Sequence, residues 1–144
     1  MSNPFDALGV NVTASVRMPI LHPGTGEVLV DENNREAYLE LLSEDSDAGQ
    51  RFDRDVSKQT IKKIRARGLK AVDDADQLEI QVDRISALIT GWHLVGLDGR
   101  AIDFPFSQEN AKRLMAEKSM AWLRRRAIAF VADAGNFMRA SSTS

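Results

Sequence analysis

The most regular hydrophobic pattern lies in the middle of the chain, where apolar residues recur at alternating steps of four and three. The series is Leu78, Val82, Ile85, Ile89 and Trp92. Such steps place side chains on one face of an α-helix. The pattern predicts a helix that begins at Asp73, Asp74 and Asp76, acids that suit a helix N-terminus, and continues to Trp92, with Gly91 weakening its last turn.

A long helix is predicted before it. Ser46 or Asp47 can cap its N-terminus, and it runs to about Arg67, where Gly68 stops it. The spacing of its apolar residues drifts around the helix, so we expect it to touch the core lightly or to bend. These residues are Phe52, Val56, Ile61 and Ile64.

Two more helices are predicted near the C-terminus. Pro105 blocks a helix upstream, and Ser107 can accept a hydrogen bond from the free amide of Glu109 or Asn110, so a helix should run from Ser107 to about residue 116. A last helix, at about residues 120–138, has one apolar face. That face contains Leu123, Ala127, Phe130, Val131, Ala134, Phe137 and Met138.

The N-terminal region follows the two-residue period of a half-buried strand. Apolar and polar side chains alternate over residues 12–18, a turn is predicted at residues 22–26, and a short strand follows at residues 28–30. A second turn is expected at residues 31–34. Residues 38–42, with the sequence YLELL, fit a third strand or a helical turn, and we favour the strand.

Together these elements predict an α+β fold that is mainly α. A small N-terminal antiparallel β-hairpin or meander precedes a four-helix C-terminal domain. The expected segments are a flexible arm at residues 1–11, the β element at 12–44, the helical domain at 45–139 and a frayed tail at 140–144. Inside the helical domain, the Asp98-Gly99 turn between Leu97 and Ile102 predicts a short hairpin.

Composition limits the function more than it names it. The 144 residues, 43% of them hydrophobic, can bury a core without covalent staples. The absence of cysteine excludes disulfides, thiolate metal sites and a cysteine nucleophile. The net charge of -2 creates no general attraction for nucleic acid or anionic membrane. No apolar run approaches the roughly 20 residues that span a bilayer, and the N-terminus does not resemble a secretory signal, so we expect a cytosolic protein.

No catalytic, cofactor-binding or metal-binding set is evident in the sequence. His22 and His93 lie far apart without ligand-spaced partners, so we interpret them as structural. Two groups of acids, Asp45, Asp47, Asp53 and Asp55 and then Asp73, Asp74 and Asp76, could be ligands for calcium or magnesium, but residues 73–79 lack the central glycine of a calcium loop and run straight into a helix. Helix capping is the better interpretation of both clusters.

The glycine pairs and basic runs also have simple explanations. The pairs at residues 24–26 and 96–99 suit turns, because neither follows a long strand and opens a helix as a phosphate-binding loop does. The basic runs at residues 62–67 and 124–126 are balanced by nearby acids. We therefore favour solvated faces, or acidic protein partners, over nucleic-acid binding.

Six large aromatic residues, concentrated in the last third of the chain, are the candidate partner-binding residues. They are Trp92, Phe104, Phe106, Trp122, Phe130 and Phe137. Burial of such side chains usually builds a core, but the same residues suit a groove that binds a helix. The sequence leaves both interpretations open, with core as the default.

Two stretches of the chain resemble the tail assembly chaperones of siphophages. Residues 20–52 contain ILHPGTGEVLVDENN and then YLELLSEDSDAGQRF, similar to that family's proline–glycine turn and its strand ending in Asp45-Ser46. Residues 88–138 contain LITGWHLVGLDGRAIDFPFSQENAKRLM and then AWLRRRAIAFVADAGNF. Where the family often has proline before its Trp-Leu pair, this chain has Met120-Ala121, so we expect a more continuous joint between its last two helices.

The resemblance implies a non-enzymatic role in the host cytoplasm during phage assembly. Proteins of this family coat the tape-measure protein, which is long, helical and prone to aggregate, and help tail-tube subunits to polymerise around it. They are absent from the finished particle. The resemblance transfers no catalytic residues, and the aromatic content also suits a homo-oligomer.

Two other functions remain open at this point. A virion structural protein, such as a minor tail or head–tail completion protein, would share the phage setting but stay in the particle. A DNA-binding regulator would use the basic helices. An enzyme is the least favoured, because no nucleophile–base pair is visible.

Overall fold

The computed structural model describes residues 5, 8–9, 12–68 and 74–138 of the chain. Most of the predicted arm at residues 1–11 lies outside this part, as do Asp73 and the predicted tail at residues 140–144. About half of the described residues are helical, and the fold class is α+β.

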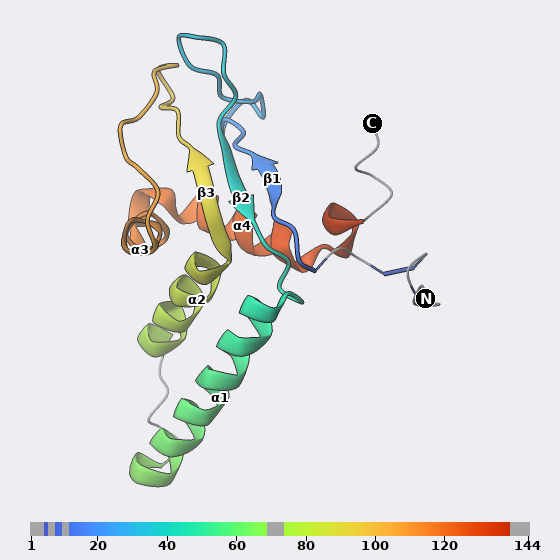
Figure 1. The fold of residues 1–144 in the computed structure, drawn as a ribbon. Helices are drawn as coiled ribbons and strands as arrows, with labels where there is room; N and C mark the ends of the chain where they lie inside the picture. Colours follow the sequence, from blue (N-terminus) through green and yellow to red (C-terminus); the bar gives the residue numbers. More distant parts are fainter. Residues whose placement is uncertain (1–4, 6–7, 10–11, 69–73, 139–144) are drawn as a thin grey trace.

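A three-stranded antiparallel sheet occupies the centre of the fold (Figure 1). The strands are β1 (Val16–Pro19), β2 (Tyr38–Leu41) and β3 (Ile89–His93), in that spatial order. Four α-helices accompany the sheet, namely α1 (Asp47–Arg67), α2 (Asp74–Leu88), α3 (Gln108–Ala116) and α4 (Ala121–Ala132). Two short 3₁₀ helices, η2 (Lys118–Met120) and η3 (Ala134–Phe137), flank α4.

Figure 1 shows α4 crossing behind the sheet, while α1 and α2 extend together from one end of it. The core lies between the sheet and helices α2, α3 and α4. Its fully buried side chains include Leu39, Leu41, Ile85, Leu88, Met115 and Leu123. Burying each of these contributes about 1.5–3 kcal/mol of hydrophobic free energy.

The helix predicted to reach Trp92 instead ends at Leu88, and the chain continues directly as β3. Trp92 pairs with Leu39 and Gly91 with Glu40, so the backbone groups after Leu88 bond to the edge of β2. The residues at this point include β-branched Thr90 and a glycine, which are poor helix formers and fit a strand beside an open edge. The sheet therefore includes a strand from the region predicted to be helical.

The other helix predictions agree with the structure, apart from the exposure of Leu78 in α2 and the C-terminal end of the last helix. Ser46 caps α1, and Gly68 ends it with a φ of 88°. In α2 the apolar face is buried at Val82 and Ile85, but Leu78 is 47% exposed. The last helix ends at Ala132 rather than at 138, because the Asp133 side chain accepts a hydrogen bond from the Gly135 amide and starts η3.

The β predictions are confirmed in part. Residues 38–42 contain β2, but the alternating pattern forms a strand only from Val16, and Val12 is 36% exposed. The strand expected at residues 28–30 consists of isolated bridges to Leu21 and Glu36. Both predicted turns are present, with positive φ angles at Gly26 and Asn34.

Candidate partner-binding groove

The chain after β3 forms the predicted short hairpin. Val95 pairs with Ala101, and Gly99 takes a φ of 80°, which the turn requires and glycine adopts without strain. The Leu94 carbonyl accepts a hydrogen bond from the Ile102 amide. This hairpin, residues 94–102, follows the C-terminal end of β3 and extends beyond that end of the sheet (Figure 1).

Three of the predicted aromatic residues meet at the base of the hairpin. Trp92 stacks on Phe104 with ring centroids 5.8 Å apart, and it packs edge to face with Phe106 with ring centroids 5.1 Å apart. The Trp92 indole N–H donates to the Phe104 carbonyl oxygen at 2.8 Å. All three side chains are half-buried, so they fix the path of the chain between β3 and α3.

An apolar groove of about 410 Å³ opens between this hairpin and the segment from α3 to α4. Its buried lining residues are Ile20, Leu29, Leu94, Val95 and Leu123. Leu97 and Ile102, which are 60% and 49% exposed, also line it. Large apolar side chains that are so exposed and share one concave surface are typical of interaction sites.

The groove contains two of the six candidate aromatic residues. Phe104 and Trp122 line it, and both are half-buried. Trp92 packs against both Phe104 and Phe106, and neither Trp92 nor Phe106 lines the groove. The sequence did not single out Leu97 and Ile102 as binding residues, although their position on either side of a glycine turn was a usable signal.

The other two candidates lie elsewhere. Phe130 and Phe137 contact each other edge to face at 5.7 Å, and Phe137 is 1% exposed. The Asn136 side-chain amide donates a hydrogen bond to the Phe130 carbonyl oxygen, which holds the segment after α4 against the end of that helix. For Phe137 the core interpretation is correct.

Arginine side chains support the groove's aromatic walls. Arg126 lies 5.0 Å from the Trp122 ring and donates to the Leu21 carbonyl at 2.7 Å. Arg124 donates to the Met115 carbonyl at 2.9 Å. Two members of the 124–126 basic run therefore hold internal positions, and only Arg125 of that run is an exposed side chain.

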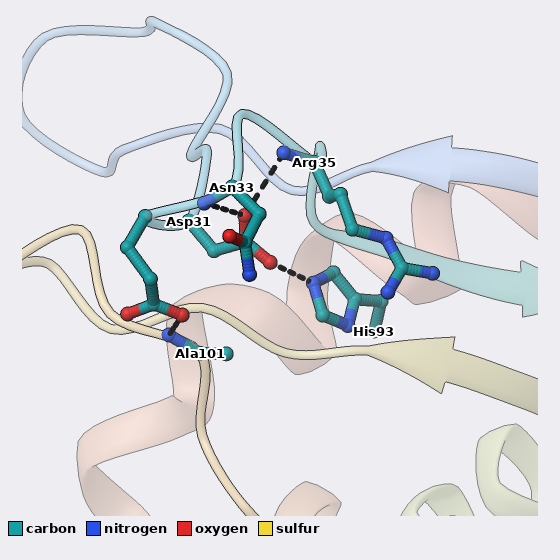
Figure 2. Close-up of polar contacts among 6 residues, drawn as sticks. Asp31, Asn33, Arg35, His93 and Ala101 are labelled. Atoms are coloured by element: carbon teal, nitrogen blue, oxygen red, sulfur yellow. Dashed lines mark hydrogen bonds and ion pairs between the residues drawn. The ribbon is translucent and has the colours of Figure 1, made fainter.

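A polar network joins the loop before β2 to β3 (Figure 2). The buried Asp31 carboxylate accepts hydrogen bonds from the backbone amides of Asn33 and Arg35, at 2.8 and 2.9 Å, and lies 2.8 Å from His93 Nε2. Because a carboxylate only accepts, the proton of this bond belongs to the imidazole. The Arg35 backbone hydrogen bond is the main cause that lowers the pKa of Asp31, and the bond to His93 adds to it.

Both histidines thus have structural partners. His93 ends a strand rather than a helix, and the His22 Nδ1 accepts from the amides of Gly24 and Thr25 within a turn. Among the described residues, no three His, Asp or Glu side chains gather in a group that could hold a metal ion. Within the same part of the chain, no helix has the length and apolar character to cross a membrane.

The joint between the last two α-helices is interrupted. α3 ends at Ala116, and Glu117 is extended with a ψ of 126°. The η2 turn then leads directly into α4 without a proline. The helical backbone is therefore continuous from η2 into α4 but not from α3 into α4. The break at Glu117 lets α3 and α4 form one side of the groove.

Comparison of the chain with protein-family models, with curated proteins and with solved structures finds no match.

Proposed function

We propose that this protein is a non-enzymatic tail assembly chaperone that binds the tape-measure protein of a siphophage and aids polymerisation of the tail-tube protein. One observation links this proposal to the groove. Every residue that lines the groove lies within residues 20–52 or 88–138, the two stretches that carry the resemblance to the chaperone family. Most of α1 and α2 lies outside these stretches.

The proposed ligand of the groove is an apolar face of a tape-measure helix. An amphipathic helix inserts side chains from successive turns into such a groove, and aromatic walls contribute much of the binding energy. Here Phe104 and Trp122 supply aromatic walls, while Leu97 and Ile102 supply exposed aliphatic contacts. A second copy of the chain could use the same contacts, which would give the homo-oligomer that the aromatic content suggested.

Co-expression tests the chaperone role. The tape-measure protein is expressed alone and together with this chain, and its soluble fraction is measured after centrifugation. The proposal predicts that the chain moves most of the tape-measure protein from the pellet to the supernatant, because its apolar helix faces become covered. An unchanged soluble fraction would contradict the proposal.

Mass spectrometry of purified virions separates the chaperone from a structural component. A chaperone acts before the particle is complete, so the chain should be absent or present only in trace amounts. Its presence at a fixed stoichiometry would instead support a minor tail or head–tail completion protein. A gel shift at about 50 mM salt tests the remaining alternative, a DNA-binding regulator.

A further inference from the structure

The solvent face of α1 carries a row of positive charges, which we call the cationic stripe. It consists of Arg51, Arg54, Lys58, Lys62 and Arg65. The steps between them are three, four, four and three, which place all five side chains on one face of a helix. All five are exposed. At a rise of about 1.5 Å per residue, the stripe is roughly 21 Å long.

The stripe faces away from the rest of the fold. The opposite face of α1 contacts α2, where half-buried Phe52 and Val56 lie between the two helices. Cations and anions on that inner face form ion pairs with α2, Asp53 with Arg84 at 2.8 Å and Lys63 with Asp76 at 4.0 Å. Figure 1 shows α1 extending away from the sheet, so its outer face is open to a partner.

No stripe residue forms an ion pair or side-chain hydrogen bond with another residue in the described part of the chain. Like charges three or four residues apart destabilise a helix. Asp47 and Asp55 lie close enough in sequence to offset only part of this repulsion. Because no anionic side chain in the described part of the chain pairs with the stripe, an anionic partner outside the chain best explains this row of five like charges.

We propose that the cationic stripe binds an acidic helix of a partner protein. A helix with glutamates at steps of three and four repeats its charges at the same spacing as the stripe, so several pairs form in one register. Ile61, which is 49% exposed and lies beside the stripe, adds an apolar contact. This surface does not depend on the groove, because no residue of α1 lines the groove.

Nucleic acid and membrane fit the stripe less well. The aromatic residue of α1, Phe52, points to α2 and cannot stack on bases. A lipid surface needs an exposed apolar face opposite the charges, but that face of α1 covers α2.

Fluorescence anisotropy with a defined probe tests this inference. The probe is a labelled synthetic helical peptide with five glutamates at the spacing of the stripe, and its control is a peptide of the same composition in scrambled order. The full chain should bind the matched peptide at least about 10-fold more tightly at about 50 mM salt, and the affinity should fall as salt rises.

Charge reversal locates the binding site. The Lys58→Glu/Lys62→Glu variant should weaken binding of the matched peptide by at least about 10-fold, because attraction becomes repulsion at two positions. The Arg100→Glu/Arg125→Glu variant has the same net charge and changes exposed residues elsewhere, so its affinity should stay within about threefold of wild type. Circular dichroism confirms that both variants fold, since glutamate and lysine have similar helix propensities.

Three results would overturn the inference. The first is failure to bind the matched peptide, or equal affinity for the matched and scrambled peptides. The second is an equal loss of affinity in the two charge-reversal variants. The third is tighter binding of a short DNA duplex or a single-stranded RNA than of the peptide, with that binding lost in the Lys58→Glu/Lys62→Glu variant. This last result would assign the stripe to nucleic acid.

Discussion

Asp31 joins the loop before β2 to the strand from which the groove hairpin emerges. Its carboxylate binds two backbone amides of its own loop and the His93 imidazole, and the neighbouring Glu32 accepts from the Ala101 amide at 3.4 Å (Figure 2). These contacts hold the 31–35 loop against both β3 and the hairpin. Asp31 is 7% exposed, so its removal would leave polar groups without partners in a buried place.

The Asp31 network predicts a pH-dependent stability. Hydrogen bonds, first that from Arg35, lower the pKa of Asp31 in the folded chain. Its contribution is therefore complete above the ordinary aspartate pKa of about 3.9 and is lost as pH falls through the lower folded pKa. The difference in free energy of unfolding between wild type and Asp31→Asn should be largest near neutral pH and shrink in acid.

Urea unfolding from neutral to acidic pH measures this difference. The exposed Asp103→Asn variant is the control, and its difference from wild type should stay near zero throughout. A constant Asp31→Asn difference across the series would show that the Asp31 charge does not contribute.

Gly49 occupies a position in α1 where a larger residue does not fit. A Cβ built there would collide with the Glu44 carbonyl oxygen, which belongs to the backbone and cannot move aside cheaply. Gly49→Ala should therefore destabilise the fold by about 1–3 kcal/mol, although alanine ordinarily favours a helix. Denaturant unfolding checks this prediction.

Gly91 provides the comparison for this prediction. The three heavy atoms nearest to a Cβ built there all belong to the Glu40 side chain, the first at 3.1 Å, and the end of that side chain can rotate away. Gly91→Ala should cost less than Gly49→Ala, and the opposite order would mean that the Glu44 backbone yields easily.

At the scale of elements, the sequence predicted most helices and turns correctly but missed β3. The α1 caps and the Ser107 cap of α3 were readable because a hydroxyl at the right distance from free amides is a local signal. The end of α2 could not be predicted from a local signal, because Ile89 and Trp92 continue the helical spacing by coincidence. The pairing of β3 with β2 is a contact between residues about 50 positions apart, and no local pattern records it.

The candidate site was predictable only in part for the same reason. The aromatic residues could be named from composition, but their grouping depends on the path of the hairpin. Phe104 and Trp122 both line a groove that forms only when α3, η2 and α4 fold back beside the hairpin. Phe137 lies in the core because the chain turns at Asp133, a turn that the uninterrupted apolar face concealed.

The Trp92 joint predicts graded losses of stability. Trp92→Phe keeps a ring against Phe104 but removes the indole hydrogen bond, which should cost about 1 kcal/mol. Trp92→Ala also removes the ring contacts and should cost about 3 kcal/mol. Leu97→Ser, at a position 60% exposed, should change the free energy of unfolding by less than about 0.5 kcal/mol.

Chemical denaturation of the three variants tests this order. Equal losses for Trp92→Phe and Trp92→Ala would show that the hydrogen bond, rather than the stacking, holds the joint. A large loss for Leu97→Ser would show that the groove surface is needed for folding and cannot be altered independently.

At the scale of the molecule, the two surfaces lie at opposite ends of the sheet. The hairpin that borders the groove follows the end of β3, and α1 begins after the end of β2, which is antiparallel to it (Figure 1). A partner helix in the groove and an acidic helix on the cationic stripe would therefore not compete for space. Such an arrangement suits a protein that contacts a long partner, or two partners, at the same time.

Affinity capture of the tape-measure protein by groove variants tests the central proposal most directly. The tagged chain is co-expressed with the tape-measure protein as wild type, as Leu97→Ser/Ile102→Ser, and as Leu78→Ser, and the ratio of the two proteins in the eluate is measured. Leu78 is 47% exposed on α2 and does not line the groove, so it is the matched control. We predict that the groove variant stays folded and recovers less than about a tenth of the wild-type amount, a loss of at least 1.4 kcal/mol in binding. Equal recovery by the wild type and the groove variant would contradict the account.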